Sequence, residues 1–472
     1  MARIAFIQDI WHEYIGIMSI SAYLKKKGHG CDVFITDGEK DLRASLEDFN
    51  PDIIAFSCLT GGHTRALEQA GALRDHFELP VIFGGIHTTL FPQIIDHPQV
   101  DMICIGEGEE TITEVLDNLD SHQKLHSIKG IWIKDGDKIY RNDVRPLIED
   151  LSSIPVPDRG LYLKYPLMRD NPLKHFMAGR GCPYNCTYCY NDSIKKVYQS
   201  KKFVRVREKG HVLRGIRYAK ENSRLETVVF DDDTFTGFRP WLKGFLKDYK
   251  HEIGLPYICN LRVENVDEKL AEMLAESGCF RVCMGIECGN ETLRNKILKK
   301  NFSNLQVIRA AEMLKSHGIK ILTNNMMGIP DETLKDTLET IKLNIEIKTD
   351  YPWCSIFQPY PETPLAEYAI EKGYLDTINI DNFYPTFFEG SLLKTDDIDS
   401  IVNVQKLFYI AIRFPWTFPL IKRLVRLPLG RIYHIIFLLS FAYRYARSNR
   451  LGLRDIFRFS VSSLRLYRQR SS

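Results

Sequence analysis

Short apolar runs alternate with amphipathic helical patterns over the first quarter of the chain. Fully apolar strands separated by helices are typical of a parallel, doubly wound sheet. The pattern therefore predicts an α/β, Rossmann-like domain over residues 1–132. Its expected strands lie at 3–8, 31–36, 53–57, 81–84 and 102–105, and its expected helices at 15–27, 62–77 and 109–119.

The loops that follow these strands are the expected ligand-binding edge, because doubly wound sheets bind ligands beyond the carboxyl ends of their strands. Most of the loops are rich in glycine, which lets a ligand approach the backbone closely. They span residues 8–12, 57–62, 84–87 and 106–109.

A second βα series follows a connection at 133–167, where Asp135 and Gly136 predict a hairpin turn and several prolines interrupt any regular element. Regular βα order over residues 168–392 predicts a partial, barrel-like parallel sheet with its chemistry at the carboxyl ends of the strands. The expected strands are 175–178, 227–230, 257–263, 280–287, 320–328 and 353–359, with helices that include 267–277 and 304–317.

Composition narrows the class of protein. The chain has 472 residues, of which 44% are hydrophobic and 26% charged, and this balance excludes a mostly disordered protein. No run reaches the roughly 18 apolar residues of a spanning helix, and no basic and apolar leader precedes Asp9. We therefore expect a cytoplasmic protein whose 11 cysteines are reduced, so that clustered cysteines indicate a metal or a catalytic site.

The C-terminal region, residues 393–472, is expected to be helical and is strongly basic. Thirteen Arg and Lys residues and a single acid, Asp455, lie between Arg413 and Ser472, in a chain whose total net charge is only +3. The apolar run 432–443 is too short to span a bilayer but suits a helix at an anionic membrane surface. A helical cap over the barrel mouth is an equally open alternative. Nucleic-acid binding is disfavoured because no binding module is recognisable.

Three cysteines carry the clearest chemistry. Cys182, Cys186 and Cys189 follow the first strand of the second series with the spacing C-x3-C-x2-C. Three thiolates in one tight loop can hold three corners of a 4Fe-4S cluster and leave the fourth iron open. The alternative is a zinc knuckle with His175 as fourth ligand, but zinc ribbons normally bring two cysteine pairs at longer separation.

This loop resembles the signature of the radical S-adenosylmethionine (SAM) superfamily, C-x3-C-x-aromatic-C, with Tyr188 at the aromatic position. The resemblance implies a six-stranded partial barrel in which the open iron chelates SAM. It also implies that one electron, from a donor such as flavodoxin or ferredoxin, splits SAM to a 5′-deoxyadenosyl radical.

The ends of the later strands extend this resemblance. Carboxylates there suit an ammonium group and ribose hydroxyls, and a guanidinium suits a carboxylate, although each could also be a solvated strand end. The residues that the resemblance assigns to SAM are Tyr188, Asp232, Arg262, Glu287 and Gly328. Cys279, Cys283 and Cys288 would allow an auxiliary cluster, but free cysteine is also a common core residue.

The N-terminal domain resembles the cobalamin-binding subclass of radical SAM enzymes in the stretches 15–28, 84–92 and 106–110. The motif D-x-H-x-x-G, whose histidine binds cobalt, is not reproduced, because Asp9, His12 and Gly16 have the wrong spacing. Cobalamin is therefore expected without a protein imidazole on the metal; the alternative is a retained fold that only shapes a substrate channel. The expected cobalamin contacts are Asp9, His12, Ser57, Thr60, Gly84, Gly85, His87, Gly106 and Glu107.

The resemblance implies cobalamin-dependent methylation of an unactivated carbon or phosphorus centre on a small molecule or lipid. A radical cyclase, a ring-rearranging enzyme or a C–C coupling enzyme of the same subclass is the main alternative. A tRNA methylthiotransferase is disfavoured because Cys31, Cys58 and Cys104 are scattered over separate elements. A non-catalytic cobalamin or metal sensor is disfavoured by the intact cysteine loop.

Overall fold

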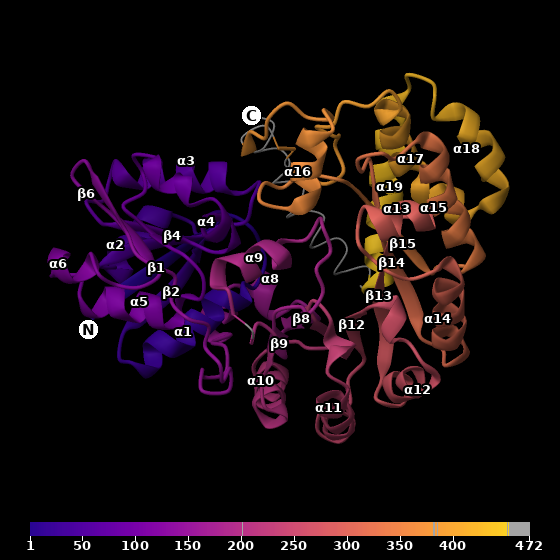
Figure 1. Cartoon of the computed structure of the whole chain (residues 1–472). Helices are drawn as coiled ribbons and strands as arrows, with labels where there is room; N and C mark the ends of the chain where they lie inside the picture. Colours follow the sequence, from indigo (N-terminus) through magenta and orange to yellow (C-terminus); the bar gives the residue numbers. More distant parts are fainter. Residues whose placement is uncertain (201, 381–382, 385, 451, 453–472) are drawn as a thin grey trace.

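The protein folds into two α/β units followed by a group of C-terminal helices (Figure 1). The computed structural model describes residues 1–200, 202–380, 383–384, 386–450 and 452. The predicted fold class is confirmed: a doubly wound N-terminal domain precedes a six-stranded parallel sheet, and helices follow it.

The first unit is a seven-stranded sheet with the order β2-β1-β3-β4-β5-β6-β7. The first five strands are parallel, and apolar side chains on both faces pack under the helices in two separate cores. The strands are β1 (Arg3–Gln8), β2 (Gly30–Ile35), β3 (Ile53–Ser57), β4 (Val81–Gly84), β5 (Met102–Cys104), β6 (Ile131–Asp135) and β7 (Lys138–Arg141). The helices are α1 (Ile15–Lys26), α2 (Leu42–Phe49), α3 (His63–Arg74), α4 (Ile86–Leu90), α5 (Gly108–Asp117) and α6 (His122–Leu125).

Residues 133–167, expected to be a plain connection, instead complete the first unit. The hairpin turn predicted at Asp135 and Gly136 is present, but its strands β6 and β7 add antiparallel to the edge at β5. Farther along, Tyr162 and Tyr165 insert into the N-terminal core. The Tyr162 hydroxyl donates to Gln8 Oε1 at 2.9 Å. Sequence patterning misses this because the unpaired β5 edge and the core that admits the two rings exist only in the folded domain.

The second unit is a six-stranded parallel sheet with the order β15-β14-β13-β12-β11-β8. Its strands are β8 (Leu173–Phe176), β11 (Thr227–Phe230), β12 (Tyr257–Leu261), β13 (Cys279–Glu287), β14 (Lys320–Met327) and β15 (Tyr351–Ile356), and β9 (Gly179–Arg180) and β10 (Arg205–Val206) form a small antiparallel pair. Two short helices, α7 (Gly160–Leu163) and α8 (Pro166–Arg169), pack on the first unit. The helices of the second unit are α9 (Tyr190–Tyr198), α10 (Lys209–Asn222), α11 (Arg239–Glu252), α12 (Glu268–Glu276), α13 (Glu291–Lys296), α14 (Asn304–Ser316), α15 (Leu334–Glu346) and α16 (Pro364–Glu371).

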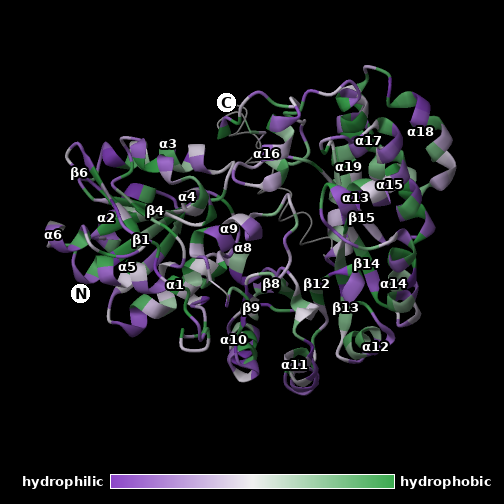
Figure 2. Ribbon diagram, in the orientation of Figure 1, coloured by the Kyte–Doolittle hydropathy of each residue, from purple (hydrophilic) through white to green (hydrophobic). Residues whose placement is uncertain are grey.

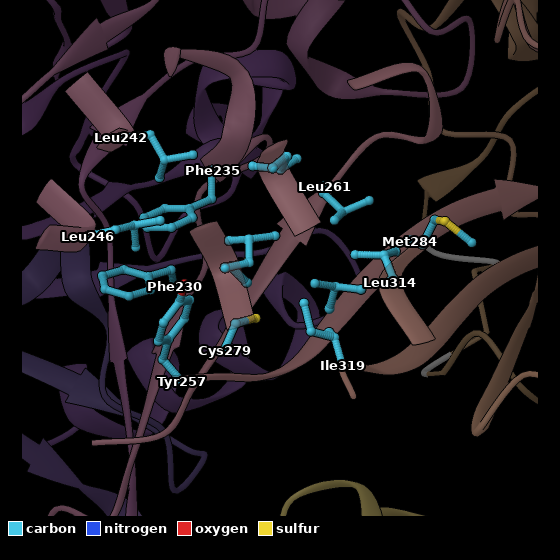
Figure 3. Packing of buried hydrophobic residues seen from close by; sticks show 14 of the residues in the cluster. Phe230, Phe235, Leu242, Leu246, Tyr257, Leu261, Cys279, Met284, Leu314 and Ile319 are labelled. Carbon is cyan, nitrogen blue, oxygen red and sulfur yellow. The ribbon is translucent and has the colours of Figure 1, made fainter. Parts of the chain in front are cut away.

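The core of this partial barrel lies between its strands and its outer helices. Phe230 stacks on Phe235 with ring centroids 4.3 Å apart, and the edge of Tyr257 meets Phe230 (Figure 3). Along β13, Val282, Met284 and Ile286 belong to this core. Because side chains alternate along a strand, the residues between them face the interior of the barrel. One face of each strand therefore packs against the outer helices, and the other face can contribute side chains to a binding site inside the barrel.

The C-terminal helices are α17 (Ile398–Arg413), α18 (Phe418–Leu424) and α19 (Gly430–Ser448). The apolar face of α17 packs with β15 and α15 in a core of their own. Among the helices formed by the described residues, none is both long and apolar enough to cross a bilayer. Five of the basic residues counted in the sequence lie outside the described part, namely Arg454, Arg458, Arg465, Arg468 and Arg470, as does Asp455.

A buried group of charges joins the two α/β units. Glu13, after β1, forms ion pairs with Arg159 and with Lys174 of β8, and the Lys174 Nζ lies 3.2 Å from Glu13 Oε1. All three side chains are at most 5% exposed. Burial lowers the pKa of Lys174, whereas the Glu13 carboxylate opposes that shift. One carboxylate therefore compensates two cations at the junction of the domains.

Replacing Glu13 by glutamine should destabilise the protein strongly, because it leaves two buried cations without a counter-charge. The expected loss is about 3 kcal/mol in the free energy of unfolding. Urea denaturation followed by tryptophan fluorescence measures it. The control Lys25→Gln breaks the half-exposed pair with Asp158 and should cost less than about 1 kcal/mol. Equal losses in the two variants would contradict a special role for the buried group.

Candidate functional site

The three cysteines of the motif lie in the loop that follows β9, at the carboxyl ends of the barrel strands. Cys182 and Cys186 are buried and Cys189 is half-buried. Each sulfur faces a polar group on a different segment. Cys182 Sγ lies 3.6 Å from Thr234 Oγ1, Arg262 Nη1 donates to Cys186 Sγ at 3.1 Å, and Asn191 Nδ2 donates to Cys189 Sγ at 3.6 Å. These contacts hold each sulfur in a defined position. Burial raises the pKa of the Cys189 thiol to about 11, and the hydrogen bond from Asn191 opposes that shift.

The loop suits a cluster better than a single ion. Among the described residues, no group of three or more His, Cys, Asp or Glu side chains is arranged to hold one metal ion. Cysteines that each bind a different iron of a cube do not need to converge on one point, whereas zinc ligands do. His175, the fourth ligand of the zinc alternative, is hydrogen-bonded to Asp231 at 2.7 Å and packs against His12.

An auxiliary cluster is disfavoured for a different reason. Cys279, Cys283 and Cys288 belong to three separate groups of packed side chains: the outer barrel core, the barrel interior and the core beneath α16. Alternation along β13 separates Cys283 from its neighbours in the outer core. These cysteines are therefore packing residues in the described structure.

The backbone leading into the cysteine loop is held tightly. Asp232, after β11, accepts hydrogen bonds from the backbone N–H groups of Ala178 at 3.0 Å and Gly179 at 2.6 Å. Gly181 has a φ of +85°, and a Cβ there would lie 2.4 Å from the Phe203 carbonyl oxygen, so only glycine fits. Burial raises the pKa of Asp232 to about 7. Asp232, expected at SAM's amino group, is thus placed where it positions the loop.

Tyr188 and Glu287, two of the residues assigned to SAM, are brought together. The Tyr188 hydroxyl donates to Glu287 Oε1 at 3.0 Å, and Lys300 Nζ donates to the same oxygen at 2.8 Å. Glu287 has a φ of +64° where the pairing of β13 with β14 shifts register. A Cβ on Gly285 would lie 2.5 Å from Glu287 Oε1. The bulge and this glycine aim the carboxylate into the barrel, and such strain is common at functional sites.

A cavity of about 230 Å³ adjoins this pair at the ends of β13, β14 and β15. Besides Tyr188 and Glu287, it is lined by Asn324, Asn325, Met326, Trp353, Ser355, Ile356, Phe357, Gln358, Tyr360 and Phe387. Gln358 is 4% exposed, and its Oε1 has no hydrogen-bond partner among the described residues. An aromatic wall with amide groups and an unmatched acceptor fits a ligand that has both rings and polar hydrogens.

Arg262 and Gly328, the remaining residues assigned to SAM, do not line this cavity. The Arg262 guanidinium lies 3.7 Å above the ring of Tyr184 and pairs with Glu264 at 2.6 Å, besides its contact with Cys186. The Gly328 N–H donates to the buried Glu332 at 2.6 Å. Arg262 is therefore directed at the cysteine loop.

A second cavity, of about 260 Å³, lies in the N-terminal domain at the carboxyl ends of β1, β3, β4 and β5. Its wall is largely apolar and includes glycine backbone, which fits the bulk of a flat cofactor close to the chain. Five of the expected cobalamin contacts line it: Ser57, Gly84, Gly85, Gly106 and Glu107.

The other four expected cobalamin contacts do not line this cavity. Asp9 pairs with Arg65, and the His12 ring packs against His175 of β8. Thr60 accepts a hydrogen bond from the Tyr190 hydroxyl of α9 at 3.1 Å. His87 stacks on His63 at 4.1 Å, and burial lowers the pKa of His87 to about 3.

Charged residues connect the N-terminal cavity to the cysteine loop. Arg180, two residues before Cys182, lies 2.8 Å from Glu107 and also pairs with the buried Glu109; Arg205 lies 2.9 Å from Glu107. Burial alone would raise the pKa of Glu107, but the two guanidinium groups hold it below its usual value. The sequence analysis does not predict this network of ion pairs. The features that could have indicated it are the arginine just before the cysteine motif and the two acids that follow β5.

Two protein families match the regions of the chain that contain the cysteine loop and the N-terminal cavity. Residues 177–343 match the Radical SAM superfamily, and residues 4–116 match the B12 binding domain. The cysteine loop lies in the first matched region, and four strands bordering the N-terminal cavity lie in the second.

Curated relatives extend the similarity along the chain. The uncharacterized methyltransferase PH0819 of Pyrococcus horikoshii is 31% identical over 392 residues, which cover 80% of this chain and 84% of that protein. The anaerobic magnesium-protoporphyrin IX monomethyl ester cyclase of Rubrivivax gelatinosus is 25% identical over 427 residues, covering 84% of this chain and 74% of that protein.

Solved structures share the fold at low identity. The radical S-adenosylmethionine methyltransferase TsrM from Kitasatospora setae, with cobalamin and a 4Fe-4S cluster bound, has a TM-score of 0.66 at 16% identity and covers 79% of this chain and 75% of that chain. The cobalamin-dependent radical enzyme OxsB, with aqua-cobalamin and S-adenosylmethionine bound, has a TM-score of 0.69 at 15% identity over 99% of this chain and 75% of that chain.

Anaerobically reconstituted protein should bind about four irons and four sulfides. Cys186→Ala should lose the cluster absorbance, because it removes one corner ligand together with the acceptor of the Arg262 hydrogen bond. The matched control is Cys283→Ala, a half-buried cysteine of the barrel interior, which should keep its full iron content. Iron analysis decides between them, and a variant at position 186 that retained the iron would refute the assignment.

Proposed function

The chain belongs to the radical SAM enzymes that carry an N-terminal B12-binding domain, and on that basis we propose that it methylates an unactivated carbon or phosphorus centre of a small molecule or lipid. When bound, the cluster and SAM supply the 5′-deoxyadenosyl radical that removes a substrate hydrogen, and cobalamin supplies the methyl group. The observation that carries the proposal is the direct link, through Arg180, between a B12-domain cavity and the cysteine loop. The methyltransferase relative from Pyrococcus horikoshii supports the same reaction.

In this proposal the cluster would be held by Cys182, Cys186 and Cys189. Arg262 and Asn191 would orient two of these sulfurs by donating hydrogen bonds to them. Asp232 would hold the chain before the loop in place. The loop is fixed before any ligand arrives, so little conformational entropy would be lost on binding.

SAM would bind next to the loop, against Tyr188 and Glu287. The Glu287 carboxylate suits the ammonium or ribose hydroxyls of SAM, and Lys300 and Tyr188 orient it. The aromatic residues of the adjoining cavity would exclude water from the reacting centre and hold an apolar substrate.

Cobalamin would occupy the N-terminal cavity, with Gly84, Gly85 and Gly106 allowing close approach. No histidine is present among the described residues that line this cavity. The residues that line the cavity would therefore offer no imidazole to the cobalt. The other proposed partners are a low-potential electron donor such as flavodoxin or ferredoxin and, through the C-terminal region, the surface of a membrane.

A radical cyclase is the second candidate, and the Rubrivivax relative supports it by its similarity over 84% of this chain. The two reactions differ in their product. Methylation makes it heavier by one CH₂, whereas ring closure that joins two C–H carbons removes two hydrogens, one taken by the 5′-deoxyadenosyl radical and one lost as a proton and an electron. The test is to incubate reconstituted enzyme anaerobically with SAM, cobalamin, a reductant and cell extract, and to search for new masses. Only products that have lost hydrogen would favour the cyclase.

Glu287→Gln should reduce 5′-deoxyadenosine formation at least about tenfold, because it removes a charge-assisted contact to SAM. Its iron content should not change, since Glu287 touches no cysteine sulfur among its recorded contacts. Glu272→Gln, an exposed carboxylate of α12, serves as control and should keep wild-type turnover. Chromatography of the nucleoside products measures the effect. Equal turnover in both variants would remove Glu287 from the SAM site.

Bound cob(II)alamin should show no nitrogen hyperfine coupling from a protein histidine in its electron paramagnetic resonance spectrum. His12→Ala should leave that spectrum unchanged, because the His12 ring is occupied with Tyr14 and His175. His126→Ala, which removes a histidine of the distant β6–β7 edge, is the matched control. A coupling present in the wild type and lost only in the His12 variant would show that this histidine reaches cobalt.

A further inference from the structure

The last described helix, α19, has two opposite faces. Its inward stripe consists of Tyr433, Phe437, Phe441, Arg444 and Ser448, spaced three or four residues apart. Phe441 packs against Trp353 with ring centroids 5.3 Å apart, and Arg444 donates to the Pro352 carbonyl at 2.5 Å. Arg281 of β13 donates to the Ser448 carbonyl at 2.7 Å. These contacts fix α19 against the open side of the barrel.

The outward stripe of α19 is also apolar, and further exposed apolar side chains lie on α18 and in the turns beside it. We call the α18–α19 apolar face the residues Trp416, Leu420, Leu427, Ile432, Ile435 and Leu439, whose exposed fractions range from 44% to 79%. Of twenty large hydrophobic residues that are exposed in the described structure, eleven lie between Phe414 and Tyr445. Figure 2 shows hydrophobic residues along both helices. Such a concentration marks an interaction surface rather than scattered exposure.

The charges of the segment that forms this face all have one sign. Between Arg413 and Arg450 the chain has eight Arg and Lys residues and no Asp or Glu. Arg413, Arg423, Arg426 and Arg431 are exposed beside the apolar side chains. No ion pair is recorded for any of them in the described part of the chain. Exposed apolar side chains with these cations beside them fit a binding partner that has an apolar interior and an anionic surface.

We propose that the α18–α19 apolar face binds the surface of an anionic membrane. Its aliphatic side chains would enter the boundary between headgroups and acyl chains, and the surrounding guanidinium and ammonium groups would meet lipid phosphates. This inference rests on the proposed function in one respect, since it names the surface that makes the membrane contact proposed there. It does not depend on which reaction the enzyme catalyses. Phe441 packs on Trp353, which lines the barrel cavity, so the membrane-bound helix would also support that cavity's wall.

The positive charge of this face favours an anionic membrane over the other possible binding partners. A second copy of the chain would bring the same cations to the interface and be repelled, as would residues 453–472, whose charged side chains are mostly Arg. Nucleic acid is less suitable, because single-stranded nucleic acid stacks on aromatic side chains and the centre of this face is leucine and isoleucine.

Flotation with vesicles tests the proposal on the full-length reconstituted enzyme. Wild type should float with vesicles of phosphatidylcholine and phosphatidylglycerol, and at least about tenfold less with phosphatidylcholine alone, because each cation contributes about 1 kcal/mol at an anionic surface. The double variant Ile435→Asp and Leu439→Asp should stay at the bottom with both. Its control, Leu305→Asp, alters a leucine of α14 that is 53% exposed and should float as wild type does.

A charge-reversed variant separates the electrostatic contribution. Lys422→Glu with Arg426→Glu should bind the anionic vesicles at least about tenfold more weakly, and Lys243→Glu with Lys247→Glu on α11 should not. All variants should keep their iron content and their cleavage of SAM, so loss of flotation alone does not affect the proposed reaction.

Three outcomes would overturn the membrane proposal. The first is that wild type remains unbound with both vesicles, and the second is that the Leu305 control loses binding as fully as the double variant. The third is that wild type without vesicles is a dimer that the double variant converts to a monomer, in which case the face joins two copies. Absence of SAM cleavage in a wild type that still floats would contradict the proposed function and leave the membrane surface intact.

Discussion

Arg180 pairs with Glu107 and Glu109, and much of the functional arrangement depends on these contacts. The two carboxylates follow β5 in the N-terminal domain, and the arginine stands in β9, two residues before the first cysteine of the loop. Glu109 is only 2% exposed, so its charge is stable there only while the guanidinium is beside it. The pairing therefore holds the N-terminal cavity and the cysteine loop in one orientation.

Buried carboxylates also compensate more than one cation at the other contacts between the domains. Glu13 compensates Arg159 and Lys174, and Arg205 shares Glu107 with Arg180. Each of these groups would be costly to bury alone, and Lys174 of β8 and Arg205 of β10 come from the barrel side of the junction, whereas both carboxylates come from the N-terminal side. Relative motion of the domains would separate buried charges, so the two cavities are expected to keep a constant distance during the reaction.

The C-terminal helices extend this arrangement outward. Arg444 is buried between Trp353, Phe441 and the carbonyl of Pro352, so one arginine of the basic region has a structural role. The inward stripe of α19 packs against β13 and β15, while its outward stripe remains exposed, so a structural role of this helix is compatible with the proposed membrane contact.

The amino-acid sequence by itself determined the order of strands and helices, the two α/β units, the cysteine motif and the basic C-terminal region. Apolar periodicity, glycine at helix ends and cysteine spacing are local properties, so they can be read along the chain. Tertiary structure alone decided that the β6–β7 hairpin joins the first sheet and that Arg262 meets Cys186. It also decided that Asp9, His12, Thr60 and His87 do not line the N-terminal cavity while Glu107 pairs with two arginines. These contacts join residues that are far apart in the chain. Packing of the cores decides which strand ends come together, and therefore which of these residues meet.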